Sequence, residues 1–271
     1  MTYVNIYKQI IRTVIMEVEI HNNIHAEAFC SIFQHIKLFT EHINVTFEKE
    51  RLYMQSMDSG NITIVELNLP KSWFDKYSIS KNIVLGINAS IFHKVLSIRE
   101  KGQQIRLSVD KNRNDKLTVE FTGSSNDSFN KSFELPLMDI DTDLLAIPEF
   151  TTDVTINFDS SKFASMINQM TIFNDTIDFH CSQKGIVCKS CGNEHGKMEV
   201  SIGNEFIETS IKQDIKLGFA LHKLHDICMY SKLSKKVTIL LTENFPIKFI
   251  YTIGDSEGRM MFYLAPKIDE D

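Results

Sequence analysis

Residues 135–153 read LPLMDIDTDLLAIPEFTTD, a stretch that alternates between acidic and apolar side chains and has Pro136 and Pro148 near its ends. On each side of it the same succession occurs, with helical spacing followed by short strands, over residues ~18–135 and ~151–271. We therefore expect two similar domains, 18–135 and 151–271, joined by a connecting loop at 136–150. Residues 1–17 are then an N-terminal extension.

Outside this connector, apolar and polar residues mostly alternate with a period of two, which is typical of half-buried strands. The clearest runs are Ile62–Leu69, Ile105–Val109, Leu117–Phe121, Val154–Phe158, Met198–Ile202, Ile207–Ile211 and Ile247–Ile253. Short, closely spaced strands joined by polar or glycine-containing turns favour antiparallel sheets. The fold class is therefore α+β, with two helices expected in each half.

Four segments have apolar residues at helical spacing, each of which predicts one buried stripe. The stripes are Phe29, Ile32, Phe33, Ile36 and Phe39; Ile91, Val95 and Ile98; Phe163, Met166, Ile167, Met170 and Phe173; and Leu221, Leu224, Ile227 and Cys228. Ser160 and Ser161 are the candidate N-caps of the third helix.

The net charge of −6, from 29 basic and 35 acidic residues, is unusual for a nucleic-acid-binding protein. The 43% hydrophobic content is sufficient for a buried core, and no run approaches the roughly 18 apolar residues of a membrane span. Five dispersed cysteines do not form a secreted disulfide pattern, and Lys8 and Arg12 interrupt the apolar N-terminus. We expect a soluble intracellular protein with no membrane partner.

Motifs for phosphate-binding loops, serine hydrolases and zinc proteases are absent from the sequence. Asp139, Asp141 and Asp143 have the spacing of a calcium loop, but Leu144 replaces the required glycine and Phe150 the required glutamate. A second metal hypothesis is a zinc site made by Cys181, Cys188, Cys191 and His195. Against it, Cys188 and Cys191 diverge if one strand continues through both, because successive strand side chains point to opposite faces.

Three strings carry a family resemblance: Met54–Ser59 (MQSMDS), Leu137–Glu149 (LMDIDTDLLAIPE) and Phe262–Ile268 (FYLAPKI). Together they resemble proliferating cell nuclear antigen, the eukaryotic-type DNA sliding clamp family, over residues ~18–271. The resemblance implies a homotrimeric, pseudo-sixfold ring in which twelve helices line a central hole. Such a ring encircles double-stranded DNA without reading its sequence and tethers DNA polymerase and other clients. A clamp loader is a further implied partner, and no catalytic residue, cofactor or metal is implied.

The charge distribution agrees with a ring around DNA. Windows 26–43, 89–102, 160–174 and 220–236 carry nine basic and four acidic residues, a net +5, which leaves −11 elsewhere. The resemblance and helix rotation give the DNA-facing candidates Lys37, His93, Lys94, Lys101, His222 and Lys223. Other basic positions of the family are occupied by Ser165, Asn168 and Met229, so we expect a shallow salt dependence of DNA contact.

The family also docks client peptides in an apolar pocket beneath the connector. The corresponding positions are Met57, Ile62, Leu145, Ile147, Pro148, Pro246, Tyr263, Ala265 and Pro266. The acidic tail Asp269–Asp271 is expected to attract basic residues that flank a client motif. For the subunit interface, the resemblance implies pairing between edge strands that carry Phe133 and Leu135 on one copy and Met198 and Val200 on the next.

Two alternatives remain open from the sequence. Within the same fold, the chain is a subunit of a specialised heterotrimeric ring or a monomeric processivity factor. In another class, it is a zinc-containing interaction protein. The expected location is the nucleus or, for a viral protein, the site of viral DNA replication.

Overall fold

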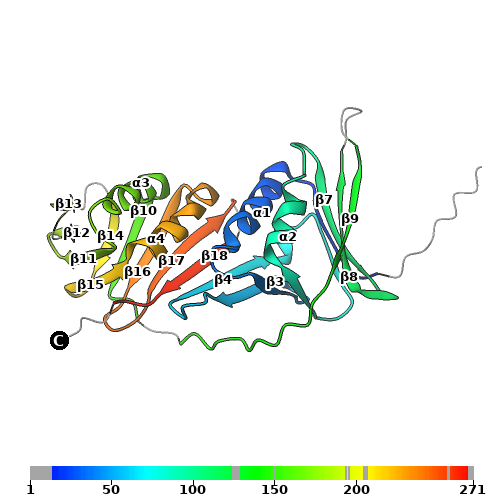
Figure 1. Ribbon diagram of the computed structural model, residues 1–271, viewed down its shortest axis with the longest axis horizontal. Coiled ribbons are helices and arrows are strands. Elements are labelled where there is room, and N and C mark those ends of the chain that lie inside the picture. The colour runs from blue at the N-terminus through cyan, green and yellow to red at the C-terminus, as the bar shows by residue number, and fades with distance from the viewer. Residues whose placement is uncertain are drawn as a thin grey trace, which may run out of the picture.

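The connector and the helices lie on opposite edges of an elongated molecule (Figure 1). The computed structural model describes residues 14–123, 129–148, 151–192, 194, 196–203, 207–254 and 257–267. Within these residues every helix is too short or too polar to cross a lipid bilayer.

The described residues of the first half form α1 (Asn23–Ile36), α2 (Ala89–Leu96), the short 3-10 helix η1 (Lys71–Trp73) and nine strands. The strands are β1 (Val14–Ile20), β2 (His42–Phe47), β3 (Arg51–Met57), β4 (Thr63–Pro70), β5 (Lys76–Ile79), β6 (Ile83–Asn88), β7 (Gln104–Asp110), β8 (Arg113–Thr122) and β9 (Lys131–Pro136). Asn22 caps α1, because its side chain accepts hydrogen bonds from the backbone amides of Ile24 and His25.

In the described residues of the second half, α3 (Ser160–Met170), α4 (Leu221–Cys228) and the 3-10 helix η2 (Met229–Leu233) accompany nine strands. These are β10 (Val154–Asp159), β11 (Thr176–Ser182), β12 (Gly185–Gly192), β13 (Gly196–Ile202), β14 (Glu208–Ile211), β15 (Ile215–Ala220), β16 (Lys236–Leu241), β17 (Ile247–Ile253) and β18 (Gly258–Leu264). The predicted α+β class with antiparallel sheets is confirmed.

The two halves share one topology. The sheet order β5-β1-β7-β8-β9 of the first half recurs as β14-β10-β16-β17-β18, and β4-β3-β2-β6 recurs as β13-β12-β11-β15. Antiparallel pairing between β18 and β4 joins the halves into one nine-stranded sheet. The other two sheets end at β9 and at β13, which are the topological counterparts of β18 and β4.

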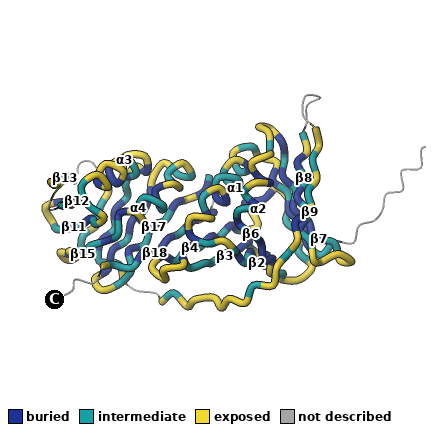
Figure 2. The backbone as a smooth tube through the Cα atoms, viewed as in Figure 1, coloured by how far each residue is buried: buried dark blue, intermediate teal, exposed yellow. Residues whose placement is uncertain are grey.

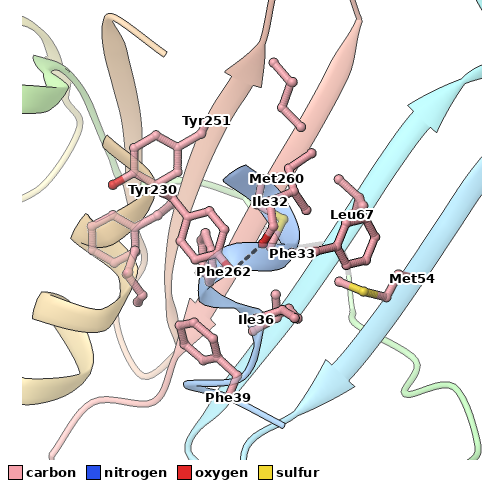
Figure 3. Packing of buried hydrophobic residues seen from close by; sticks show 14 of the residues in the cluster. Ile32, Phe33, Ile36, Phe39, Met54, Leu67, Tyr230, Tyr251, Met260 and Phe262 are labelled. Atoms are coloured by element: carbon pink, nitrogen blue, oxygen red, sulfur yellow. Dashed lines mark hydrogen bonds between the residues drawn. The ribbon is translucent and has the colours of Figure 1, made fainter. Parts of the chain in front are cut away.

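A buried aromatic cluster holds the helices of the two halves together (Figure 3). The ring of Tyr230 in η2 lies 4.9 Å from that of Phe262 in β18, and its hydroxyl donates a hydrogen bond to the Ile32 carbonyl of α1 at 3.2 Å. Phe39, just beyond α1, packs 5.4 Å from Phe262. Burial follows this layer between the helices and the sheets, while the connector is exposed (Figure 2).

Two details of the predicted helices are wrong. In α2 the buried face is Ala89, Phe92, Val95 and Leu96, while Ile91 and Ile98 are 46% and 45% exposed. A stripe shifted by one residue was compatible with the same spacing, because Phe92 and Leu96 are also apolar. In α3 the N-cap is Asp159, whose carboxylate accepts from the Lys162 amide, and Ser160 is the first helical residue.

The expected N-terminal extension is also shorter than predicted. β1 begins at Val14, and Glu17 already pairs with Ser78 of β5 and Ser108 of β7. The limit at residue 17 therefore falls inside a strand. The alternation is weak here because three consecutive residues, Met16 to Val18, are all buried. Residues 1–13 lie outside the described part of the chain.

Candidate functional site

The connector crosses the outer side of the nine-stranded sheet, and three of the polar contacts of its described residues anchor it there. The Met138 amide donates to the Gly86 carbonyl at 2.9 Å, and the Asn44 side chain donates to the Ile140 carbonyl at 2.9 Å. Gly86 is required at the first anchor, since a Cβ there would lie 2.1 Å from the Met138 oxygen.

The third anchor is reciprocal. The Gln55 side chain of β3 donates to the Leu145 carbonyl at 3.1 Å and accepts from the Leu145 amide at 2.7 Å. Because the backbone amide and the carbonyl of Leu145 both bond to the same Gln55 side chain, Leu145 is fixed to β3 in position and in direction. Gln55 was not among the residues predicted for this site.

This anchor divides the space beneath the connector into two cavities. The first, about 510 Å³, is lined by predicted residues Leu145, Ile147, Pro148 and Tyr263. The second, about 490 Å³, is lined by Met57 and Leu145. Ile62, Pro246, Ala265 and Pro266 line neither cavity. Ala265 and Ile62 instead lie together, because the Ala265 amide donates to the Ile62 carbonyl at 3.0 Å.

The floor of the first cavity is polar. The Glu66 carboxylate accepts from the hydroxyls of Tyr53 at 2.9 Å and Tyr263 at 3.0 Å. The Lys248 ammonium lies 4.9 Å from the centre of the Tyr263 ring. Burial, together with the Glu66 charge, raises the pKa of both tyrosines, and burial lowers the pKa of Lys248. The cavity therefore offers fixed hydroxyls and one cation beside an apolar wall.

Sequence reasoning missed this floor although a signal was present. Glu66 occupies an outward position of the predicted strand 62–69, where alternation places it on the same face as Ile64. Only the pairing of β4 with β3 and β18 brings Tyr53 and Tyr263 to Glu66.

On the opposite edge, the helices carry most of the predicted DNA-facing residues at the surface. Lys37, Lys94 and His222 are exposed, and Lys101 is exposed in the turn that follows α2. His93, in contrast, is half-buried, and its Nδ1 atom is buried without a hydrogen-bond partner. Burial, reinforced by the charge of Lys37, lowers the pKa of His93.

The prediction for Lys223 is wrong. Its ammonium lies 2.6 Å from Asp58 Oδ2, and the two side chains are 16% and 2% exposed. Asp58 Oδ1 also accepts from the amides of Ile62 and Thr63 at 2.8 and 3.0 Å. The charge of Lys223 therefore joins α4 to the turn between β3 and β4 and is not presented to a ligand. Helix rotation alone could not reveal a carboxylate from the other half of the chain.

Lys223→Met is expected to lower the free energy of unfolding by about 3–5 kcal/mol at pH 7, because it leaves Asp58 as an unpaired buried charge. Burial alone would raise the pKa of Asp58, but Lys223 and the two amides lower it overall. The ion pair thus stabilises the wild type above pH ~4, and this contribution disappears as pH falls through the lowered pKa. Urea unfolding at pH 7 and pH 4 measures the difference.

In the Lys223→Met variant the Asp58 pKa should rise, so its deficit relative to wild type is largest at pH 7 and shrinks toward pH 4. Lys235→Met, which removes an exposed lysine just before β16, is the matched control and should change stability by less than about 0.5 kcal/mol. An equal loss at both pH values would contradict the ion-pair explanation.

The cysteines do not support the zinc hypothesis. Cys188 is buried and Cys191 is exposed, so they lie on opposite faces of β12, as the strand interpretation predicted. Among the described residues, no group of three or more His, Cys, Asp or Glu side chains is arranged to hold a metal ion. His195, Phe150 and the acidic tail 269–271 lie outside the described residues.

Comparison with known proteins covers nearly the whole chain. The family "Proliferating cell nuclear antigen, N-terminal domain" matches residues 16–144, and "Proliferating cell nuclear antigen, C-terminal domain" matches residues 146–267. The "Probable DNA polymerase sliding clamp 2" of Paramecium bursaria Chlorella virus 1 is 29% identical over 252 residues, 91% of this chain and 89% of that protein. The "Proliferating cell nuclear antigen" of Chaetomium thermophilum is 29% identical over 244 residues, 87% of this chain and 93% of that protein.

Proposed function

The chain belongs to the proliferating cell nuclear antigen family, and from this premise we propose how its surfaces divide the work of a DNA sliding clamp. The protein is a processivity factor and not an enzyme. It acts by topology, since a ring threaded on DNA dissociates only by opening. DNA, a polymerase and further copies of the chain are its partners, and a homotrimeric ring is typical of the family.

The observation that carries the proposal is the internal repeat. Because β18 pairs with β4 inside the chain, their counterparts β9 and β13 are suited to pair between chains. Each such contact repeats the junction that already exists within the molecule. Identical head-to-tail junctions between six similar domains close into a ring of three chains.

The repeat also predicts the register of this seam, the pairing of β9 of one copy with β13 of the next. The Lys267 amide donates to the Gly218 carbonyl as the Met138 amide does to Gly86, at 2.8 and 2.9 Å, so Lys267 corresponds to Met138. Counting back five residues along each segment, Phe262 corresponds to Phe133.

For the other edge, paired residues can be followed across the sheets. In the first half, cross-strand pairing links Leu67 to Met54, Met54 to Val45 and Val45 to Leu85. In the second half, it links Val200 to Cys188, Cys188 to Phe179 and Phe179 to Leu217. The two series correspond because Leu85 and Leu217 directly precede the matching residues Gly86 and Gly218. Leu67 therefore corresponds to Val200, and Val65 to Met198. Since Phe262 pairs with Val65, Phe133 should lie opposite Met198 of the adjacent copy.

The same register places Glu134 opposite Lys197 of the adjacent copy. Opposite charges directly across an antiparallel pair stabilise it, by about 0.2–1 kcal/mol. Leu135 and Val200, the other residues expected at the interface, then belong to the same two edge strands. This complementarity supports β9 and β13 as the subunit interface.

For clients, we assign docking to the two cavities beneath the connector. Leu145, Ile147, Pro148 and Tyr263 form the wall of the first, and Met57 belongs to the second. Aromatic or aliphatic side chains of a client peptide fit the apolar walls, and its polar groups can reach the Tyr53–Glu66–Tyr263 floor. The polymerase and the clamp loader are the clients that a processivity factor requires.

For DNA, we assign the helix edge with Lys37, His93, Lys94, Lys101 and His222, without Lys223. Lysines at a ring's inner wall attract the phosphate backbone without reading bases. The domain limits that fit this division are one clamp domain ending at residue 135, a connecting loop at 136–150 and a second domain from 151. The similarity to a nuclear-antigen protein and to a viral clamp supports a nuclear or viral replication site.

Light scattering coupled to gel filtration tests the assembly, and a mass of three chains is expected. Loading onto DNA tests the topology, because a closed ring should be retained on circular duplex and should slide off after linearisation. A monomer at high concentration would contradict the ring and favour a monomeric processivity factor. An assembly of three chains that forms only when other subunits are added would indicate a heterotrimer.

A further inference from the structure

The first connector cavity, of about 510 Å³, has two charged side chains on its floor, Glu66 on β4 and Lys248 on β17. The strand β18 separates β4 from β17 in the nine-stranded sheet (Figure 1). Of the described residues that line the cavity, no other is charged. A client that fills the cavity therefore meets one carboxylate and one ammonium.

The protein itself compensates the Glu66 carboxylate. Its Oε1 atom accepts a hydrogen bond from the Tyr53 hydroxyl at 2.9 Å, and its Oε2 atom accepts one from the Tyr263 hydroxyl at 3.0 Å. Burial, together with the Glu66 charge, raises the pKa of both tyrosines, so the two hydroxyls stay protonated and donate at neutral pH. Each oxygen of Glu66 thus has a fixed donor, and this carboxylate does not depend on a client for stabilisation.

Lys248 lacks a comparable partner. In the described part of the chain, no carboxylate lies within ion-pair distance of its ammonium, and no acceptor forms a hydrogen bond with it. Its contact is with the face of the Tyr263 ring, whose centre lies 4.9 Å from Nζ. Burial lowers the pKa of Lys248, Glu66 offsets this effect only in part, and Arg259 lowers the pKa further. The half-buried ammonium is therefore not fully compensated by the protein.

A bound client would cover this ammonium and remove it from water. Burying a charge without a partner is strongly unfavourable, so the client must bring an acceptor to Lys248. A carboxylate is the strongest acceptor that a peptide side chain offers, because its hydrogen bonds to an ammonium are assisted by charge. A basic client side chain would instead be repelled by Lys248, while Glu66 already has two donors.

We propose that the clients of this protein carry an acidic side chain beside their apolar anchor, and that this carboxylate pairs with Lys248. The inference rests on the proposed function, in which clients dock in the cavities beneath the connector. It adds a chemical class to that function, since the wall with Ile147 holds the anchor and Lys248 selects the adjacent acid. Glu66 limits where the acid can lie, because it repels a carboxylate placed near the two tyrosines.

The first experiment selects ligands from a phage-displayed library of random dodecapeptides, with the full-length protein as bait. Peptides are selected on the wild type and counter-selected on Ile147→Asn, which makes the cavity wall polar without adding a charge. Light scattering and circular dichroism verify that the two proteins fold and assemble alike. The selected peptides should combine aromatic or aliphatic residues with an Asp or Glu at a constant distance from them.

Isothermal titration then compares the best selected peptide with a copy in which the acid is replaced by its amide. The wild type should prefer the acidic peptide by about tenfold, as expected for one partly buried hydrogen bond between charged groups. Lys248→Met should bind both peptides alike, whereas Lys248→Arg should retain part of the preference because it keeps the charge. Glu66→Gln should strengthen binding of the acidic peptide, because it removes a repelling carboxylate and its amide can still bond the tyrosines.

The matched control is Lys184→Met, which removes an exposed lysine from the turn between β11 and β12 and should keep the full preference. Lys248→Gln is measured in parallel, so that the result does not depend on the folding of one variant. Equal binding of the two peptides by the wild type would overturn the inference. A preference that survives in Lys248→Met or Lys248→Gln would overturn it as well, since the acid is then recognised elsewhere.

The selection separates failure of the inference from failure of the proposed function. Peptides that require the Ile147 wall but carry no acid would leave client docking in place and overturn the inference alone. If no peptide discriminates the wild type from Ile147→Asn, docking in this cavity is itself wrong, and the inference fails with it. An acid preference that is lost in Lys248→Met and kept in Lys184→Met supports both.

Discussion

Ile147→Asp should abolish capture of client peptides by an otherwise intact protein. Ile147 is half-buried in the wall of the first connector cavity, between Leu145 and Pro148. A carboxylate at this position would be desolvated by a bound client and would face the same cavity as the Glu66 carboxylate. Burying an uncompensated charge costs several kcal/mol, so the affinity should fall at least about a hundredfold.

Ala146→Asp is the matched control, since it adds the same charge to the adjacent connector residue, which is exposed and lines neither cavity. Isothermal titration with a peptide from the cognate polymerase measures both variants. The control should bind within about threefold of wild type, as expected for an exposed change of charge. Equal binding by Ile147→Asp, Ala146→Asp and wild type would refute docking in this cavity.

Phe133→Lys and Met198→Glu should each convert the proposed trimer to monomers. Phe133 is half-buried on the edge strand β9 and packs 5.8 Å from Phe121, and Met198 is half-buried on the edge strand β13. Either change places one unpaired charge in every seam. At roughly 3 kcal/mol per buried charge, each contact weakens about 150-fold.

The register makes a sharper prediction for the double variant. If Phe133 of one copy lies opposite Met198 of the next, then Phe133→Lys and Met198→Glu in the same chain face each other at each seam. The trimer should be partly restored, and the coupling energy follows from a double-mutant cycle on the light-scattering data. Thr252→Glu, on an exposed position of β17, is the charge control and should remain trimeric. Additive loss in the double variant would exclude this register.

Several parts of the fold could be predicted because they depend on local pattern. The period of two located strands such as Ile247–Ile253 at their observed limits, and the apolar spacing located all four helices. The errors arose where two local patterns were equally good. Ile91 and Phe92 both continue an apolar stripe, and only the packing of Phe92 against Phe29 and Phe33 of α1 selects the latter.

The site was predictable to a smaller degree. Family strings located Leu145, Ile147, Pro148 and Tyr263, which do line one cavity. They could not indicate that Gln55 fixes Leu145 and divides the space in two, because that contact spans 90 residues of sequence. The assignment of Lys223 to the DNA-facing group failed for the same reason, since its partner Asp58 belongs to the other half of the chain.

By itself, the sequence determined the α+β fold class, the places of the four helices and of several strands, and the membership in a clamp family. These depend on short-range periodicity and on strings of adjacent residues, which folding does not alter. Tertiary structure alone decided which charges are free and which are paired, and where the connector is anchored. It also decided that β18 pairs with β4, the junction on which the proposed pairing of β9 with β13 is based. Those properties depend on distances between residues far apart in the chain, and only packing sets such distances.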